Sequence, residues 1–468
     1  MESSFHGVIA FALMAVMLVI GSLLRKAIPI LRNALIPSSI VGGLLGFCLL
    51  SLNIIPGFNA DDFTSLTFHF FTLSFMSLCL TGSSKNKSLS GGSIVRGGLW
   101  LTVIWTISLG LQGIIGYGII IVYDQLTGSD VSAFLGAIIT HGFTQGPGQA
   151  FTFGTIWEQE YGIVNAAQVG MIYASLGFLV AFLVGVPWAK RIISTGKNLN
   201  RKSSIDTSFL SGFYPPGKQP ENGRIITHSA NMDSLAWHLG LLAIAYVLTH
   251  IWLVLARDLA AGFSPWGLNI DVLFSHNMFF IHGLGMCVLL RVFIDKAGLS
   301  LYVDDETLKR ITSSSVDFMV VGTMMSIQFA VLYALLTPIL LVTLVITLVT
   351  LFGCWWMGRL SGKLGHERAI TAFGCCCGST GSGLLLLRML DPDFSTSVAK
   401  ELAFFNLAIV LVNLHLLFIF APIAPSLSST TYLFIFGGTA FVALLTVPLL
   451  MGKLTLGTSL NNVKESAK

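Results

Sequence analysis

Eleven apolar runs, each long enough to cross a lipid bilayer as a helix, dominate this sequence. A bilayer core about 30 Å thick needs roughly 20 apolar residues per helical crossing. Helices satisfy their own backbone hydrogen bonds in lipid, so such runs predict an all-α polytopic membrane protein. The predicted spans are Phe5–Leu24, Ile36–Ile55, Phe63–Thr81, Gly97–Val122, Val164–Pro187, Leu235–Ala256, Val272–Phe293, Val316–Leu336, Ile339–Met357, Val398–Ala421 and Tyr432–Met451.

The overall composition supports lipid as the solvent for most of the chain. Of 468 residues, 54% are hydrophobic and only 10% are charged, too few to cover a water-soluble globule. The net charge of +4 comes from cations beside apolar runs, which explains it without a nucleic-acid partner. The first apolar run is span-length and lacks a cleavage-site pattern, so we expect it to remain as a helix.

Two further apolar segments are interrupted by glycine and small polar residues, at about 131–157 and about 369–390. Broken backbone at membrane depth leaves unpaired N–H and C=O groups, which protein or a solute pathway must satisfy. We therefore interpret both segments as glycine-rich re-entrant hairpins and as candidate sites.

The positions of the basic residues allow an independent test of this topology. If both hairpins return to the side they enter from, 25 of the 26 Lys and Arg residues fall on one side, with Arg257 the exception. Basic loops are retained in the cytoplasm, so the pattern predicts an N-terminus outside and a C-terminus inside the cytoplasmic (inner) membrane. If the first broken segment were a full span, every later loop would lie on the opposite side of the membrane.

The order of elements repeats once along the chain: four spans, a broken segment and a fifth span. Five crossings are an odd number, so the second repeat is inverted relative to the first. We predict a first repeat at 1–188, a flexible cytoplasmic linker at 189–234, a second repeat at 235–421, and an extra helix with a short tail at 422–468. Secondary transporters with inverted repeats bind solute at the repeat interface.

The first broken segment reads THGFTQGPGQAF, from Thr140 to Phe151. Freed carbonyls can replace the hydration shell of sodium, and the N-terminus of a half-helix can hold a carboxylate. A glycine-rich packing turn without a ligand is the alternative. The candidate ligands here are Thr140, His141, Thr144, Gln145, Gly146 and Gly148.

The second broken segment, GCCCGSTGSGLLLL from Gly374 to Leu387, offers the same chemistry. Its three adjacent cysteines point in different directions on a helix, whereas zinc sites need spaced pairs, so we interpret them as small packing residues. No cofactor is predicted besides sodium as the coupling ion. The candidate ligands are Gly378, Ser379, Thr380, Gly381 and Ser382.

Several other polar residues in apolar surroundings are candidates with a structural alternative. Arg388 can hold a substrate carboxylate or anchor the segment at the membrane rim beside Asp391 or Asp393. Asn406 and Asn413 share a helix face, and like Asn165 they are ligands or interhelical hydrogen-bond donors. The membrane histidines His69 and His415 are interpreted as packed neutral side chains.

With the broken segments placed, the chain resembles the bacterial sodium/glutamate symporter family. GPGQAF at 146–151, YGIVNA at 161–166, Gly177 and GVPWAKR at 185–191 follow the order and spacing of that family, as does IPSSIVGGLLG at 36–46. The resemblance implies sodium-driven uptake of glutamate by a homodimer whose hairpin-bearing core moves against a scaffold. After Gly383, this chain has Leu384–Arg388 where glutamate carriers have a Thr-Pro-Thr type of stretch. Because of this difference, the predicted solute is the class of small carboxylates, with glutamate as its leading member.

These observations predict a secondary symporter that binds sodium and a small anionic solute and contacts the lipid bilayer. The alternative within transport is proton-coupled or exchange movement of a di- or hydroxycarboxylate. An enzyme needs a nucleophile, base and acid converging at one depth, and the sequence shows no such set. A channel is the third class, and solute-accelerated exchange distinguishes a carrier from it.

Overall fold

The computed structural model describes residues 2–82, 92–200, 208, 211–217, 219, 223–262, 270–392 and 394–465. The regular elements in these ranges are all helical. Asp393, one of the two acids considered as partners of Arg388, lies outside the described residues, as do parts of the predicted linker. The chain forms two compact units, which are described separately.

Unit 1 contains residues 1–23, 38–85 and 213–328. Its main helices are α1 (Glu2–Ala27, whose last turn belongs to unit 2), α3 (Ser38–Ser51), α4 (Asp61–Leu80), α10 (Ser234–Ala260), α11 (Phe279–Lys296) and α12 (Asp305–Met325), with the short turns η4 (Asp271–Phe274), η5 (His276–Met278) and η6 (Ser300–Tyr302).

Unit 2 contains residues 24–37, 86–212 and 329–468. Its helices are α2 (Pro29–Asn33), α5 (Gly92–Thr127), α6 (Phe134–Ala137), η2 (His141–Gln145), α7 (Pro147–Tyr161), α8 (Ala166–Ser194), α13 (Phe329–Ala334), α14 (Leu336–Arg359), α15 (Gly365–Cys377), α16 (Thr380–Leu390), α17 (Val398–Val412), η7 (His415–Phe420), η8 (Ala424–Ser426) and α18 (Ser429–Glu465). Both units take helices from each predicted repeat, and both broken segments lie in unit 2.

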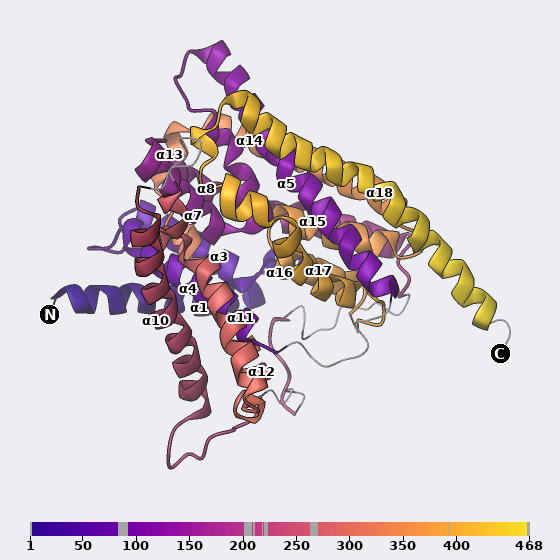
Figure 1. Cartoon of the computed structure of the whole chain (residues 1–468), viewed down its shortest axis with the longest axis horizontal. Helices are drawn as coiled ribbons and strands as arrows, with labels where there is room; N and C mark the ends of the chain where they lie inside the picture. The colour runs from indigo at the N-terminus through magenta and orange to yellow at the C-terminus, as the bar shows by residue number, and fades with distance from the viewer. Residues whose placement is uncertain are drawn as a thin grey trace. The chain divides into compact units, whose positions relative to one another are not determined.

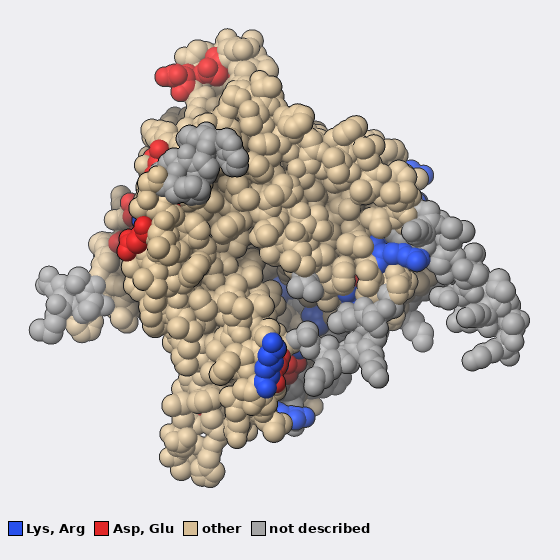
Figure 2. Space-filling view, viewed as in Figure 1, with Lys and Arg blue, Asp and Glu red and all other residues tan. Residues whose placement is uncertain are grey.

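Eight helices in the described ranges are long and apolar enough to cross a membrane. Most of the described surface in Figure 2 is uncharged, and Lys, Arg, Asp and Glu side chains gather in a few small patches. The chain is therefore a multi-pass membrane protein. The eight helices are α1, α4, α5, α8, α10, α11 with η5, α14 and α18.

Three predicted spans differ in length or position from the helices observed. Ile36–Ile55 becomes the 14-residue α3, and Val398–Ala421 is divided at Asn413 into α17 and the π-helical η7. The prediction of one helix over Val316–Leu336 is wrong, because α12 begins at Asp305 and ends at Met325. The side chain of Asp304 accepts the N–H of Thr307 and so starts α12 eleven residues early, in a polar turn that a search for apolar runs does not count.

Glycines allow the helices of unit 1 to cross at close range. A Cβ on Gly42 of α3 would lie 2.1 Å from the carbonyl oxygen of Met17, and one on Gly21 of α1 would lie 2.3 Å from that of Ser38. Both distances are shorter than any real contact, so α1 and α3 can meet only without side chains there. Close approach of this kind supplies the van der Waals packing that holds helices together in lipid.

In unit 2, the long helix α5 packs along the extra C-terminal helix α18 (Figure 1). Gly110 of α5 faces the carbonyl of Phe436, with 2.5 Å between a built Cβ and that oxygen. The hydroxyls of Tyr117 and Ser429 are 2.8 Å apart and join the same two helices. Helix α18 is therefore an integral part of unit 2.

Candidate functional site

The first broken segment is interrupted where the sequence predicts it. The π-helical turn η2 stops at Gly146, whose backbone has φ +91° and ψ −179°. Only glycine adopts this conformation without strain, because it has no Cβ. Pro147 then starts α7 at a position that suits its fixed φ and its lack of an N–H.

The second break is an extended stretch between α15 and α16. Gly378 and Ser379 leave the helix, and α16 restarts at Thr380. The N–H groups of Gly378 and Ser379 both donate to the carbonyl of Gly374, at 3.1 and 3.3 Å. The carbonyls of the last turn of α15 therefore lose their usual helical donors and must find other partners.

The two breaks meet in unit 2. A Cβ on Gly146 would lie 3.8 Å from the carbonyl oxygen of Gly378, so the two interrupted backbones are close enough for a single added methyl group to span the space between them. Helix α8 passes beside both through Gly177. A Cβ on Gly177 would lie 2.2 Å from the carbonyl oxygen of Cys377 and 3.1 Å from the ring of Phe143. Two helix N-termini and two helix C-termini are thus brought together against α8.

Helix α5 fixes both breaks with polar side chains that the sequence analysis did not select. The indole N–H of Trp105 donates to the carbonyl of Thr144 at 3.0 Å. The amide nitrogen of Gln112 donates at 3.0 Å to the freed carbonyl of Cys376, and it also lies 3.0 and 3.1 Å from the hydroxyls of Ser108 and Thr350. An amide inside a predicted span was the signal available for Gln112, because amides in lipid face a bundle interior.

Several polar atoms around the first break are buried and poorly paired. The amide of Gln145 and Nδ1 of His141 have no hydrogen-bond partner among the described residues apart from an interaction between these two side chains, and Oε1 of Gln112 has none. The His141 ring lies edge-on between the rings of Phe153 and Trp157. A buried polar atom without a partner costs about 1–3 kcal/mol, so a cluster of them indicates groups that a ligand satisfies.

The threonines of the first segment have structural bonds. The hydroxyl of Thr140 donates to the carbonyl of Leu109 on α5 at 2.6 Å, and that of Thr144 donates to the carbonyl of Thr140. Each hydroxyl oxygen still has acceptor capacity for a cation. At the second break, the hydroxyl of Ser379 accepts the N–H of Ser382 and caps α16, although at 3.4 Å this bond is long.

Four other predicted candidates occupy turns, helix ends or a helix face in unit 2. Asn165 has φ +65° in the turn that leads into α8, at the opposite end of α7 from Gly146. Arg388 lies over the ring of Phe394 at 5.4 Å, eight residues or about 12 Å along α16 from Thr380. This position favours the rim-anchor alternative for Arg388. Asn406 lies half-buried on α17, and Asn413 is fully buried at its end, where its amide nitrogen donates to the carbonyl of Ile409.

A buried ion pair joins the start of the second broken segment to α17. The guanidinium of Arg368 donates to both carboxylate oxygens of Glu401, at 2.8 and 2.7 Å, and to the carbonyl of Ser361. Glu401 also accepts from the hydroxyl of Ser397, at 2.8 Å. Both charged side chains are at least 94% buried, which makes the pair expensive to break.

The other end of the same segment is fixed by Asp391, in the loop after α16. Its carboxylate is buried and accepts from the backbone and hydroxyl groups of Ser395 and Thr396 and from the amide of Asn200. Burial alone would raise the pKa of Asp391, but the hydrogen bonds from Thr396, Asn200 and Ser395 outweigh it and lower the pKa to about 2. The stabilising charge is therefore present above the ordinary pKa and is lost only as the pH falls toward 2.

Comparison with known proteins identifies the family of the chain. The family model for the sodium/glutamate symporter matches residues 4–384. This chain belongs to the sodium/glutamate symporter family. The sodium/glutamate symporters of Escherichia coli (strain K12) and Shigella flexneri are each 24% identical over 398 residues, which cover 81% of this chain and 88% of theirs.

The family match includes both breaks and most of the helices around them. It begins in α1 and ends at Leu384, two turns before the end of α16, so α17 and α18 lie beyond it. Membership makes the protein a transporter and not an enzyme. At 24% identity this chain is a divergent member of the sodium/glutamate symporter family.

Proposed function

We propose that this transporter carries out sodium-coupled symport of glutamate, or a closely related small carboxylate, across the cytoplasmic membrane. The observation that carries the proposal is the meeting of two interrupted helices at Gly146 and Gly378 within unit 2. The names of the family and of its relatives support sodium and glutamate as the solutes.

The chemistry of the breaks fits both solutes. No side chain among the described residues caps the N-terminus of α7, so the N–H groups of Gly148 and Gln149 are open to a carboxylate and favour it through the helix dipole. The N–H groups of Thr380 and Gly381 occupy the equivalent positions in the first turn of α16. The carbonyls released at the C-terminal ends of η2 and α15, with the hydroxyls of Thr144 and Ser379, are hard oxygen ligands for sodium, and Gln145 can satisfy either solute.

The wider architecture of the proposal follows from the sequence. The two repeats are inverted, both broken segments are re-entrant, and the N-terminus lies outside and the C-terminus inside. The protein acts as a homodimer, and unit 2 carries the solutes while unit 1 serves as the scaffold. An internal site that opens alternately to the two sides couples the downhill entry of sodium to the uphill entry of the carboxylate.

The first prediction concerns the coupling ion and the solute. Purified protein in liposomes should accumulate labelled glutamate when an inward sodium gradient is imposed, and unlabelled glutamate should compete better than citrate, malate or succinate. Replacing external sodium with choline should reduce uptake to the level of empty liposomes. Undiminished uptake in choline, driven instead by a pH gradient, would identify a proton-coupled carrier and exclude sodium coupling.

The second prediction concerns Gln145. Because the buried amide of Gln145 has no hydrogen-bond partner among the described residues except the side chain of His141, Gln145→Leu removes a desolvation cost and should leave the melting temperature nearly unchanged. Uptake should nevertheless fall at least tenfold, since a ligand group worth roughly 1.4 kcal/mol or more is lost. Uptake equal to wild type would contradict a solute-binding role for Gln145.

The comparison with Gln112 provides the control for that variant. Gln112 is bonded to Cys376 and to two hydroxyls, so Gln112→Leu should lower the melting temperature as well as uptake. The two substitutions should therefore differ in their effect on the melting temperature, although both should reduce uptake. Thermal unfolding in detergent and uptake in liposomes, measured on the same preparations, separate the two roles.

A further inference from the structure

Unit 1 contains a cavity formed by its own residues. Its volume is about 350 Å³, within the range of small-ligand sites. The first residues of α10, one face of α12 and the segment that precedes α10 form its walls. The lining residues are Gly223, Arg224, Ile225, Asp233, Ser234, Leu235, Thr307, Arg310, Ile311 and Ser314.

Two arginines and three hydroxyl groups give this cavity its chemistry. On α12, Thr307, Arg310 and Ser314 are spaced by three and four residues, so they share the face that lines the cavity. Arg224 enters from the preceding segment, where its backbone N–H donates to the carboxylate of Asp304 at 3.1 Å. A planar guanidinium binds a phosphate group through two parallel hydrogen bonds, which hydroxyls can supplement.

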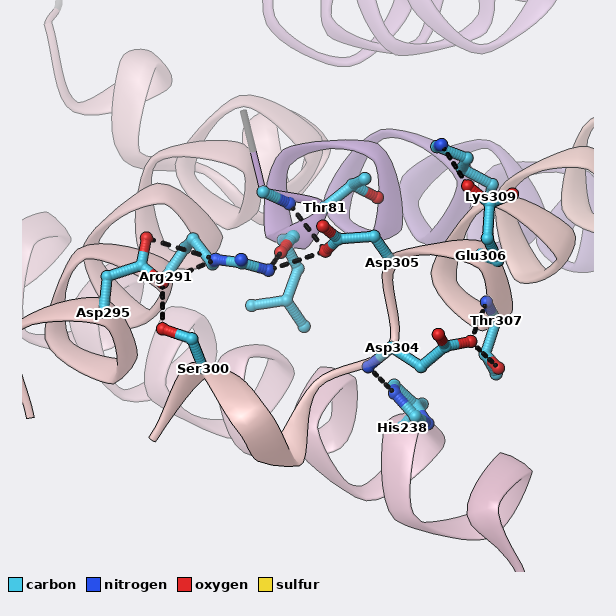
Figure 3. A network of polar contacts seen from close by, with 12 residues as sticks. Thr81, His238, Arg291, Asp295, Ser300, Asp304, Asp305, Glu306, Thr307 and Lys309 are labelled. Carbon is cyan, nitrogen blue, oxygen red and sulfur yellow. Dashed lines mark hydrogen bonds and ion pairs between the residues drawn. The ribbon is translucent and has the colours of Figure 1, made fainter. Parts of the chain in front are cut away.

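The neighbouring carboxylates are engaged in holding the walls (Figure 3). Asp304 accepts from both the N–H and the hydroxyl of Thr307, at 2.9 and 2.7 Å, and Asp233 accepts from the N–H of Leu235 at 2.8 Å. Burial raises the pKa of Asp304, but the hydrogen bonds from Thr307 and from the N–H of Arg224 outweigh burial and lower this pKa. The carboxylate of Asp304 therefore stays anionic. Arg224, Arg310 and the carboxylate of Asp233 line the cavity itself, and Asp304 lies behind Thr307, so the guanidinium groups are the cationic donors that a phosphodiester would meet.

The position of the cavity indicates where such a phosphodiester comes from. Helix α10 is one of the eight membrane-length helices, and its apolar span starts at Ser234 in the cavity wall. Two apolar side chains of the wall face outward, Ile225 at 84% and Leu235 at 49% exposure. A ligand with a phosphodiester head and acyl tails can place the head between the arginines and the tails along α10.

We propose that this cavity binds the headgroup of an anionic phospholipid, held by Arg224 and Arg310. The bound lipid joins the segment before α10 to α12 and thereby stabilises unit 1. A free phosphate ester shares the headgroup chemistry but lacks the acyl tails, so it should bind far more weakly.

The test is lipid-dependent thermal stability of the full-length protein in detergent. Phosphatidylglycerol should raise the melting temperature of the wild type at lower concentrations than phosphatidylcholine does. Arg224→Gln with Arg310→Gln should raise the phosphatidylglycerol concentration needed at least tenfold, because each arginine near a membrane surface contributes a factor of about five. Inorganic phosphate up to the same concentration should have no effect.

Matched variants make each outcome decisive. Lys309→Gln removes a charge beside Arg310 from an exposed ion pair with Glu306 that does not line the cavity, so it should change the lipid requirement less than twofold. Ser314→Phe keeps both arginines but fills the cavity, and it should behave like the double variant. An equal phosphatidylglycerol response in wild type and Ser314→Phe, or an equal response to phosphatidylcholine, overturns the proposal. Stabilisation by inorganic phosphate overturns the assignment to lipid.

Discussion

Gly177→Ala is expected to abolish transport while leaving the protein in the membrane. The added Cβ would lie 2.2 Å from the carbonyl oxygen of Cys377, a backbone atom that cannot rotate away. Helix α8 or the second break must therefore move, and overpacking of this kind costs about 1–3 kcal/mol or more. Because the displaced atoms are those that meet at the proposed site, uptake should fall about a hundredfold, measured as the initial rate of sodium-driven glutamate uptake.

Gly118→Ala is the matched control for this variant. Gly118 lies within α5 of the same unit, and a Cβ there would meet no atom within 4 Å. Alanine favours a helix over glycine by up to about 1 kcal/mol, so Gly118→Ala should preserve or raise both stability and uptake. Wild-type uptake by Gly177→Ala would show that the second break tolerates displacement and would remove it from the proposed site.

The positions of both helix breaks could be predicted from the sequence because their cause is local. Gly146 and Pro147 together cannot continue a helix, and the run of small residues after Cys377 weakens one. Most membrane spans are equally local, since length and apolar content decide them. Helix α12 was misplaced because its first turns are polar and are stabilised by a cap at Asp304.

Contacts between distant segments could not be predicted in the same way. The hydrogen bond from Gln112 to Cys376 joins residues 264 positions apart, and nothing in either local sequence specifies the other. The pairing of the two breaks is of the same kind. For Arg388 the sequence left a substrate ligand and a rim anchor both open, and only its place eight residues along α16 from Thr380 favours the anchor.

The ion pair of Arg368 and Glu401 illustrates what a single sequence conceals. Glu401 lies inside a predicted span, and an ionisable residue at membrane depth is by itself a signal of a partner or a function. Its partner Arg368 directly precedes the predicted hairpin at about 369–390, and nothing in its local sequence indicates that it is buried against Glu401. The glycine that makes room for the pair is Gly97 of α5, where a built Cβ would lie 2.1 Å from the carboxylate carbon of Glu401.

Breaking this ion pair is expected to have the largest effect on stability. Glu401→Gln or Arg368→Gln leaves a buried charge without its partner, which costs about 3–5 kcal/mol. Either variant should lower the melting temperature strongly and reduce uptake, because the pair fixes the start of the second broken segment to α17. Lys309→Gln, at an exposed ion pair in unit 1, should cost less than about 1 kcal/mol under the same conditions.

The double variant Arg368→Met with Glu401→Leu separates stability from function. Replacing both charges by apolar groups removes the desolvation cost, so the double variant should be more stable than either single variant and within about 1–2 kcal/mol of wild type. If the pair serves only to hold α15 against α17, uptake should recover together with the melting temperature. Recovered stability without recovered uptake would instead show that the two charges have a role in transport beyond holding the fold.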